Sequence, residues 1–145
     1  MIKEDYKIRE MTIEDYDAVF AFWQSIDGLR MDESDTKENL SFYLKRNPHL
    51  SYIVLKKDRI IIGTIKSGQD GRRGYINHLA IDKKHQKLGL AKKLYNICLE
   101  EFKRQGIYRC NLYVLQSNTE ALSFWEQNGW NELEVDYKML QKKIN

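Results

Sequence analysis

The chain has 145 residues, of which 42% are hydrophobic and 31% are charged. These values are typical of a globular protein with a core of its own, and we expect one domain over residues 1–145. No apolar run is long enough to span a membrane and the first ten residues lack the apolar segment of an export signal, so we expect a cytoplasmic protein with no membrane partner. The formal net charge of +3 is too small to indicate nucleic-acid binding by itself.

Two cysteines and three histidines are the residues that would hold a soft metal ion. Cys98 and Cys110 are too few and too far apart for a metal site or a disulfide framework, and His49, His78 and His85 share no ligand spacing. We therefore expect packed thiols and no metal.

Hydrophobic periodicity, turn residues and helix caps predict ten elements in the order β-α-α-β-β-β-α-β-α-β. Strands are expected at 5–9, 50–55, 60–67, 74–82, 108–115 and 130–140, and helices at 13–26, from 34 or 35 to 47, at 88–102, and from 117 or 118 to 128. This order fits an α/β (α+β) domain with a mixed, mostly antiparallel central sheet and helices on both of its faces.

The chain is organised around the strand at 74–82 and the helix that follows it. A strand that enters a helix through a glycine-bearing turn leaves backbone N–H groups free at the helix start, and these groups favour a bound phosphate. Gly89 permits a ligand to approach the main chain closely, and Ala91 keeps the next position small. Positive charge around the turn comes from lysines 83, 84, 87, 92 and 93.

Other functions for this turn are weaker. The glycine patterns of dinucleotide-binding folds and P-loops are absent. Nucleic-acid binding by the lysines is disfavoured because no exposed aromatic residues lie between them. The remaining alternative is a plain strand–turn–helix connection with solvated lysines.

Two motifs in this chain resemble those of the GNAT superfamily of N-acetyltransferases. The first, Q/R-x-x-G-x-G/A after an apolar-Ala-apolar-Asp strand end, appears as Leu79-Ala80-Ile81-Asp82 followed by Gln86, Gly89 and Ala91. The second, N-x-x-A-x-x-[FL]-Y-x-x-x-G-F, appears as Asn118, Ala121, Phe124, Trp125, Gly129 and Trp130. Leu29-Arg30 after a Trp-bearing helix is also similar to small single-domain bacterial members of the YpeA type.

The resemblance implies the GNAT fold and direct transfer of acetyl from acetyl-CoA to a primary amine of a small molecule or of a protein or peptide N-terminus. It also implies that the strands at 74–82 and 108–115 splay apart at their C-terminal ends and admit the pantetheine arm. The residues that it implies for acetyl-CoA binding are Leu79, Ala80, Ile81, Gln86, Lys87, Leu88, Gly89, Leu90, Ala91, Lys92, Asn118, Ala121, Phe124 and Trp125. Solvation of the lysines and a helix N-cap role for Asn118 are the structural alternatives.

Trp125 departs from the family pattern. Many members carry a tyrosine there that protonates the leaving thiolate, whereas an indole N–H donates hydrogen bonds but is no practical acid. Three explanations are open. Either the thiolate leaves unassisted, or another phenol such as Tyr113 protonates it, or the protein is a non-catalytic acyl-CoA-binding module.

His78 is the best candidate for a base, because it precedes Leu79-Ala80-Ile81 and an imidazole titrates in the required range. The alternative is a packed strand histidine. For the acceptor, the acidic loop at 27–35 would attract a cationic amine through Asp32, and Arg30 would pair with a carboxylate on the same molecule; a solvated loop explains these charges equally well. The expected strand at 130–140 leaves both a monomer and a homodimer open.

Overall fold

The computed structural model describes residues 5–144, which form two units divided after Tyr113. The first unit contains the sheet and three α-helices, and the second contains one α-helix and the C-terminal segment. Each unit is described by itself.

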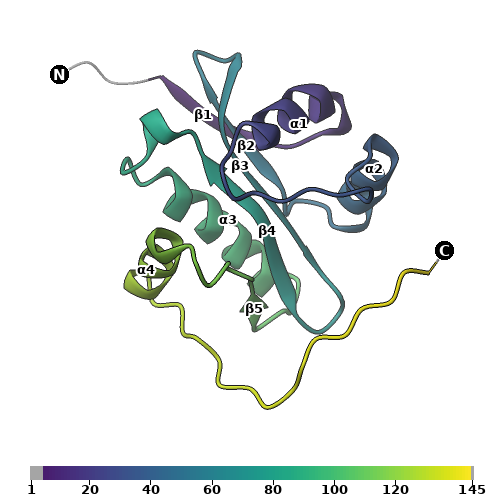
Figure 1. The fold of residues 1–145 in the computed structure, drawn as a ribbon. Coiled ribbons are helices and arrows are strands. Elements are labelled where there is room, and N and C mark those ends of the chain that lie inside the picture. The colour runs from purple at the N-terminus through teal and green to yellow at the C-terminus, as the bar shows by residue number, and fades with distance from the viewer. Residues whose placement is uncertain (1–4, 145) are drawn as a thin grey trace. The chain divides into compact units, whose positions relative to one another are not determined.

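The first unit begins with a strand and ends shortly after a very short one (Figure 1). Its elements are β1 (Tyr6–Glu10), the 3-10 turn η1 (Ile13–Asp15), α1 (Tyr16–Gln24), α2 (Lys37–Arg46), β2 (Tyr52–Lys56), β3 (Ile60–Gln69), β4 (Gly74–Ile81), the 3-10 turn η2 (Lys83–His85), α3 (Leu90–Arg104) and β5 (Cys110–Asn111).

The five strands form one sheet in the order β1-β2-β3-β4-β5. The neighbouring pairs from β1 to β4 are antiparallel, and β5 pairs with β4 in parallel. This confirms the expected mixed, mostly antiparallel sheet. The central strands β3 and β4 are the ones on which the candidate site is built.

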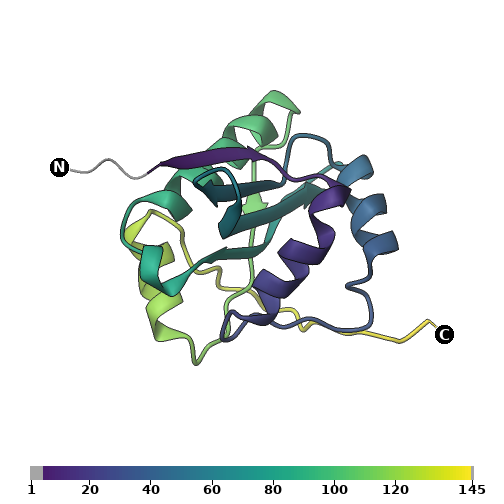
Figure 2. The ribbon, with the colours of Figure 1, turned by 90° about the horizontal axis from the view of Figure 1, so that it is seen from above.

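Helices cover both faces of the sheet in the first unit. Figure 2 shows α1 and α2 on one face and α3 on the other. A buried cluster under α1 and α2 includes Trp23 and Leu40 from the helices and Ile53 from β2. The opposite face receives the apolar stripe of α3, whose buried residues are Leu90, Leu94, Tyr95, Cys98 and Phe102.

Caps and left-handed residues explain why the helices begin later than predicted. Thr12 and Asp15 form a capping box, but it starts a 3-10 turn, and the α-helix proper begins at Tyr16. The second helix starts at Lys37 because the Thr36 side chain accepts a hydrogen bond from the Asn39 amide. The third starts at Leu90 because Gly89, with φ +80°, has a left-handed conformation that no helix continues through.

The fifth strand is much shorter than the predicted range of 108–115. Only Gly74 with Cys110 and Tyr75 with Asn111 are paired. The apolar alternation correctly predicted extended chain, but a strand exists only as far as a neighbouring backbone supplies hydrogen bonds. The two strands thus separate after their first residues, as the resemblance implied.

The second unit contains α4 (Thr119–Gln127). Asn118 is its N-cap, since its Oδ1 accepts a hydrogen bond from the Ala121 amide at 3.1 Å. The predicted strand at 130–140 is wrong, because the structure assigns no strand to residues 130–144. Alternating apolar residues predict which side chains would share a face, not whether a partner strand is present.

Both cysteines are free thiols. Cys98 is fully buried on α3, and burial raises its pKa to about 11; burial likewise raises the pKa of Cys110 to about 12. Raised pKa values keep both thiols protonated and therefore weakly nucleophilic near pH 7. Within residues 5–144, no helix is long and apolar enough to cross a membrane, and no three His, Cys, Asp or Glu side chains gather as a metal site would require.

Candidate active site

A β-bulge interrupts β4 in the middle of the sheet. Thr64 of β3 pairs with Ala80 and Lys66 pairs with Asn77, so the single residue between them faces two residues of β4. One of these is His78, whose φ of +47° is unusual for a residue with a side chain. Such a conformation is strained and persists only where the surroundings hold it, which is common at functional sites.

Two buried side chains hold the bulge from the other elements. The Thr64 hydroxyl donates to the His78 carbonyl at 3.0 Å, and the Trp23 indole N–H donates to the Thr64 Oγ1 at 2.8 Å. Thr64 has no exposed surface and Trp23 is 2% exposed. The Trp23 ring also contacts the imidazole edge-on, with ring centroids 4.7 Å apart. We call this chain from Trp23 through Thr64 to the His78 carbonyl the bulge relay.

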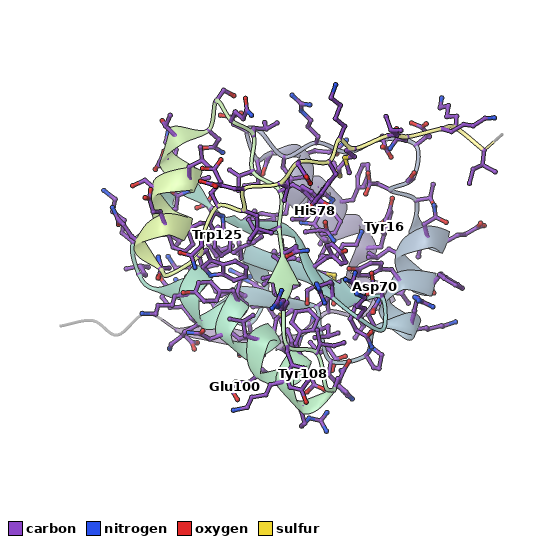
Figure 3. The ribbon with its side chains drawn as sticks, turned by 90° about the horizontal axis from the view of Figure 1, so that it is seen from below. Tyr16, Asp70, His78, Glu100, Tyr108 and Trp125 are labelled. Atoms are coloured by element: carbon purple, nitrogen blue, oxygen red, sulfur yellow. The ribbon has the colours of Figure 1, made fainter. Side chains whose placement is uncertain are left out.

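The loop between α1 and α2 brings a carboxylate to the same imidazole. Asp35 Oδ1 lies 3.6 Å from His78 Nε2, and both side chains are largely buried. The loop is held in place because the Tyr16 hydroxyl donates to the Asp35 carbonyl at 2.8 Å and the Asp32 amide donates to Asp35 Oδ2 at 2.7 Å. Figure 3 labels His78 of β4 and Tyr16 of α1.

Lys66 of β3 adds a positive charge near His78, with its Nζ 4.5 Å from the centre of the Tyr43 ring. Burial and the charge of Lys66 lower the pKa of His78, and Asp35 opposes them. Burial also lowers the pKa of Lys66, again against the effect of Asp35. His78 is therefore neutral near pH 7, with a lone pair that can accept a proton.

Beyond the bulge, one edge of β4 has no strand beside it. The first two residues of β4 pair with β5, whereas its remainder, through Ile81, has a partner only on the β3 side among the described residues. Free backbone N–H and C=O groups at such an edge can bind an extended amide-bearing molecule as an added strand would.

The end of β4 leads directly into the predicted phosphate-binding turn. The Gln86 side chain donates to the Ile81 carbonyl at 3.2 Å, and His85 Nδ1 lies 2.7 Å from Asp82 Oδ2. Both contacts fix the loop to the strand. A Cβ placed on Gly89 would meet no atom within 4 Å, so the space above this residue is open.

The residues around Gly89 form an exposed basic turn. Leu90 anchors the helix start in the core and Ala91 is half-buried, whereas Gln86, Lys87, Leu88 and Lys92 are exposed. Lys87, like Gly89, has a positive φ, of +66°. The free N–H groups of the first turn of α3 and the positive end of its dipole thus face an open, lysine-rich surface.

The predicted acceptor pair lies at the surface. Arg30 and Asp32 are both exposed, and Asp32 Oδ1 accepts a hydrogen bond from the nearby Ser34 amide. Two residues that sequence reasoning did not place in the site, Asp35 and Lys66, approach His78 instead. The available signals were the acidic loop itself and a lysine in the middle of a strand with no other charged residue.

The remaining predicted residues lie at or beyond the end of the first unit. Tyr113, its last residue, is 73% exposed. Asn118, Ala121, Phe124 and Trp125 belong to α4 and its cap in the second unit, where the Trp125 ring is 5.1 Å from Phe124 and 4.9 Å from Trp130 between centroids. Their roles toward a cofactor stay predictions.

Known structures share this fold. The chain superimposes on a protein of the NatC complex, crystallised with Gag peptide and CoA, with a TM-score of 0.76, 21% identity and coverage of 90% of this chain and 87% of the other. PaiA N-acetyltransferase from Thermoplasma acidophilum, solved with coenzyme A, gives a TM-score of 0.74 at 21% identity, covering 91% and 93% of the two chains.

Sequence comparison finds relatives that match nearly the whole chain. An acetyltransferase of Sodalis glossinidius (strain morsitans) is 25% identical over 138 residues, which is 95% of each chain, and one of Yersinia pestis (strain Pestoides F) is 24% identical over the same length and coverage. The family model described as Acetyltransferase (GNAT) family matches residues 8–130. The chain therefore belongs to the GNAT family and is an N-acetyltransferase that uses acetyl-CoA.

Proposed function

We propose that the protein, with residues 1–145 acting as one N-acetyltransferase domain, transfers acetyl from acetyl-CoA to a primary amine of a small molecule or of a peptide N-terminus. The observation that carries this proposal is the continuity of β4, whose bulge at His78 leads along an unpaired edge into the glycine-led start of α3. One element thus offers a base, a backbone edge and an anion-binding turn.

In this proposal the backbone of Leu79, Ala80 and Ile81 binds the pantetheine amides. The N–H groups from Gln86 through Leu88, Gly89 and Leu90 to Ala91 hold the pyrophosphate, with Lys87 and Lys92 near the outer phosphates. Asn118, Ala121, Phe124 and Trp125 of the second unit are proposed to bind acetyl-CoA as well. The assignments at the turn are supported by the open space at Gly89 and the exposure of Lys87 and Lys92.

The proposed reaction is one direct displacement in a ternary complex. The acceptor ammonium gives one proton to His78, its neutral nitrogen forms a bond to the acetyl carbon as the C–S bond breaks to release the CoA thiolate, and the second proton of the nitrogen passes to water. A neutral His78, supported by its lowered pKa, can take that proton near pH 7. The thiolate takes a proton from water or from Tyr113, and Asp32 with Arg30 at the exposed loop would guide the acceptor.

The test is a thermal shift followed by turnover. Saturation at about a hundredfold over the dissociation constant of acetyl-CoA should stabilise the fold by roughly 2.7 kcal/mol, or on the order of 5–10 °C in Tm. CoA release is then measured with a panel of amines and free-N-terminal peptides. A well-folded protein with no shift would contradict the proposal, and so would a shift without acetylation of any amine.

A further inference from the structure

Two opposite charges reach His78 from different elements of the first unit. Asp35 comes from the loop between α1 and α2, with its carboxylate 3.6 Å from the imidazole. Lys66 comes from β3, where it pairs with Asn77, the residue before His78. Arg30 and the other acidic side chains of the same loop, including Asp32, are exposed.

The ammonium of Lys66 has no oxygen partner among residues 5–144. It carries three N–H donors and lies over the face of the Tyr43 ring, and within the described residues it makes no hydrogen bond or ion pair. Burial lowers the pKa of Lys66 and the charge of Asp35 opposes this effect, so the cation is partly desolvated without a carboxylate at ion-pair distance. What the cation lacks is an anionic oxygen.

Asp35 is an anion with one carboxylate oxygen that an acceptor ammonium can approach. Its Oδ2 is used within the loop by the Asp32 amide, and its Oδ1 faces His78. An acceptor ammonium placed at this side would be attracted by Asp35 and would lie beside the imidazole that takes its proton. The site therefore presents a negative end at Asp35 and a positive end at Lys66.

We propose that the acceptor is an amino-acid-type molecule, whose carboxylate binds Lys66 while its amine lies beside Asp35 and His78. The inference rests on the proposed function and names its substrate class. With His78 neutral, Asp35 and Lys66 balance each other, so a zwitterion matches both charges. A simple amine leaves the Lys66 ammonium unpaired, which is the more costly complex.

The experiment compares acceptors that differ by one carboxylate. The pairs are phenylalanine with phenethylamine, leucine with isoamylamine, lysine with cadaverine, and γ-aminobutyrate with n-propylamine. For each, kcat/KM is measured at saturating acetyl-CoA, and binding is followed by the Tm of the protein–CoA complex. In the wild type we expect at least one acid-bearing member to be preferred about tenfold or more, the range of a charge-assisted hydrogen bond.

Three variants test whether this preference depends on the Lys66 side chain. Lys66→Met keeps an unbranched apolar side chain on the Tyr43 ring and removes the charge. The preference for the carboxylate-bearing acceptor should then fall to about threefold or less, which is what weaker contacts would leave. Lys66→Arg keeps the charge and should keep most of the preference. Lys45→Met removes an exposed lysine of α2 and serves as the matched control, with no change expected.

Each outcome decides between the proposals. Equal use of both members of every pair, or a preference that survives in Lys66→Met, overturns the inference and leaves the proposed function standing. If neither turnover nor Tm responds to any amino acid while other amines are acetylated, the inference is likewise overturned. A folded wild type with no response to acetyl-CoA overturns the proposed function itself. If Lys66→Met does not fold, Lys66→Gln replaces it. Loss of the preference in a Lys66→Gln variant with the wild-type Tm supports the inference, and a retained preference overturns it.

Discussion

Thr64 is a fully buried polar residue whose hydroxyl connects α1 to the strained backbone of His78. It donates to the His78 carbonyl and accepts from the Trp23 indole, so both of its hydrogen-bonding functions are used. A buried polar residue in this position holds the bulge in one conformation. The bulge relay is therefore a positioning device for the residue proposed as the base.

Replacing Thr64 by valine tests this role. Thr64→Val keeps the shape but leaves the Trp23 N–H and the His78 carbonyl unsatisfied, at a cost of about 1–3 kcal/mol in unfolding free energy. We expect kcat to fall roughly tenfold or more while the Tm shift with acetyl-CoA is retained. Steady-state kinetics and thermal melts provide both quantities.

Thr64→Ser is the matched control for this variant. It restores the hydroxyl and removes one methyl group, so kcat should recover most of its value. A serine variant as slow as the valine variant, or a valine variant with unchanged kcat, would show that the hydroxyl does not position His78.

The protonation of His78 depends on groups from two elements, and their removal should move the pH profile in opposite directions. Asp35 raises the pKa of His78 and Lys66 lowers it, while burial, the largest effect, lowers it below the ordinary 6.5. The base must be neutral, so kcat/KM should decline as the pH falls through this pKa, below 6.5 in the wild type. The acidic limb should move to lower pH in Asp35→Asn and to higher pH in Lys66→Met.

His78→Ala supplies the reference for these profiles. It removes the titrating group, so the acidic limb should disappear along with much of the rate. A profile that keeps the wild-type limb in His78→Ala would assign the titration to another group and remove His78 from the proposed mechanism.

At the scale of elements, the start of α3 is the feature that local sequence alone predicts most directly. A glycine before an apolar helical stripe indicates a helix N-terminus, and Gly89 has the left-handed φ and the open surroundings that an approaching ligand requires. The free N–H groups follow from helix geometry alone. Which strand feeds the turn was also readable, since β4 has its predicted start at Gly74.

Gly89→Glu should abolish the acetyl-CoA shift. The new side chain places a negative charge where the pyrophosphate is proposed to lie, and the left-handed φ adds strain of order 1 kcal/mol. Gly71→Glu is a close control, because Gly71 also has a positive φ and no neighbour within 4 Å of a Cβ. Thermal melts with and without acetyl-CoA should show the shift in Gly71→Glu and not in Gly89→Glu; a shift retained in both would move the cofactor site elsewhere.

At the scale of the whole molecule, the sheet and the C-terminal segment differ in their backbone hydrogen bonding. The central strand β3 is paired on both sides, whereas residues 130–144 form no strand. Amides in central strands open only with large-scale unfolding, while unpaired amides exchange readily. Hydrogen exchange should accordingly be slow in β3 and fast at 131–140.

The same measurement tests the expected C-terminal strand. Slow exchange at 131–140 would mean that this alternating segment is paired in solution. Repeating the measurement over a range of protein concentrations separates pairing within one chain, which does not depend on concentration, from pairing between two copies, which does.

The sequence by itself determined the order of the first nine elements, the antiparallel-led sheet and the glycine turn. Periodicity, caps and glycines are local signals, so they predict local structure such as the Asn118 cap and the helix that follows Gly89. The family motifs are local too, which is why the family could be recognised from the sequence alone.

Only the tertiary structure decided what surrounds His78 and which extended segments become strands. Asp35 and Thr64 lie far from His78 in the chain, and their contacts with it follow from strand register and loop course, which no local pattern encodes. The same reason limits β5 to Cys110–Asn111, because a strand ends where its neighbour stops supplying hydrogen bonds. Local sequence therefore predicted the cofactor turn, and long-range packing assembled the charges proposed to select the acceptor.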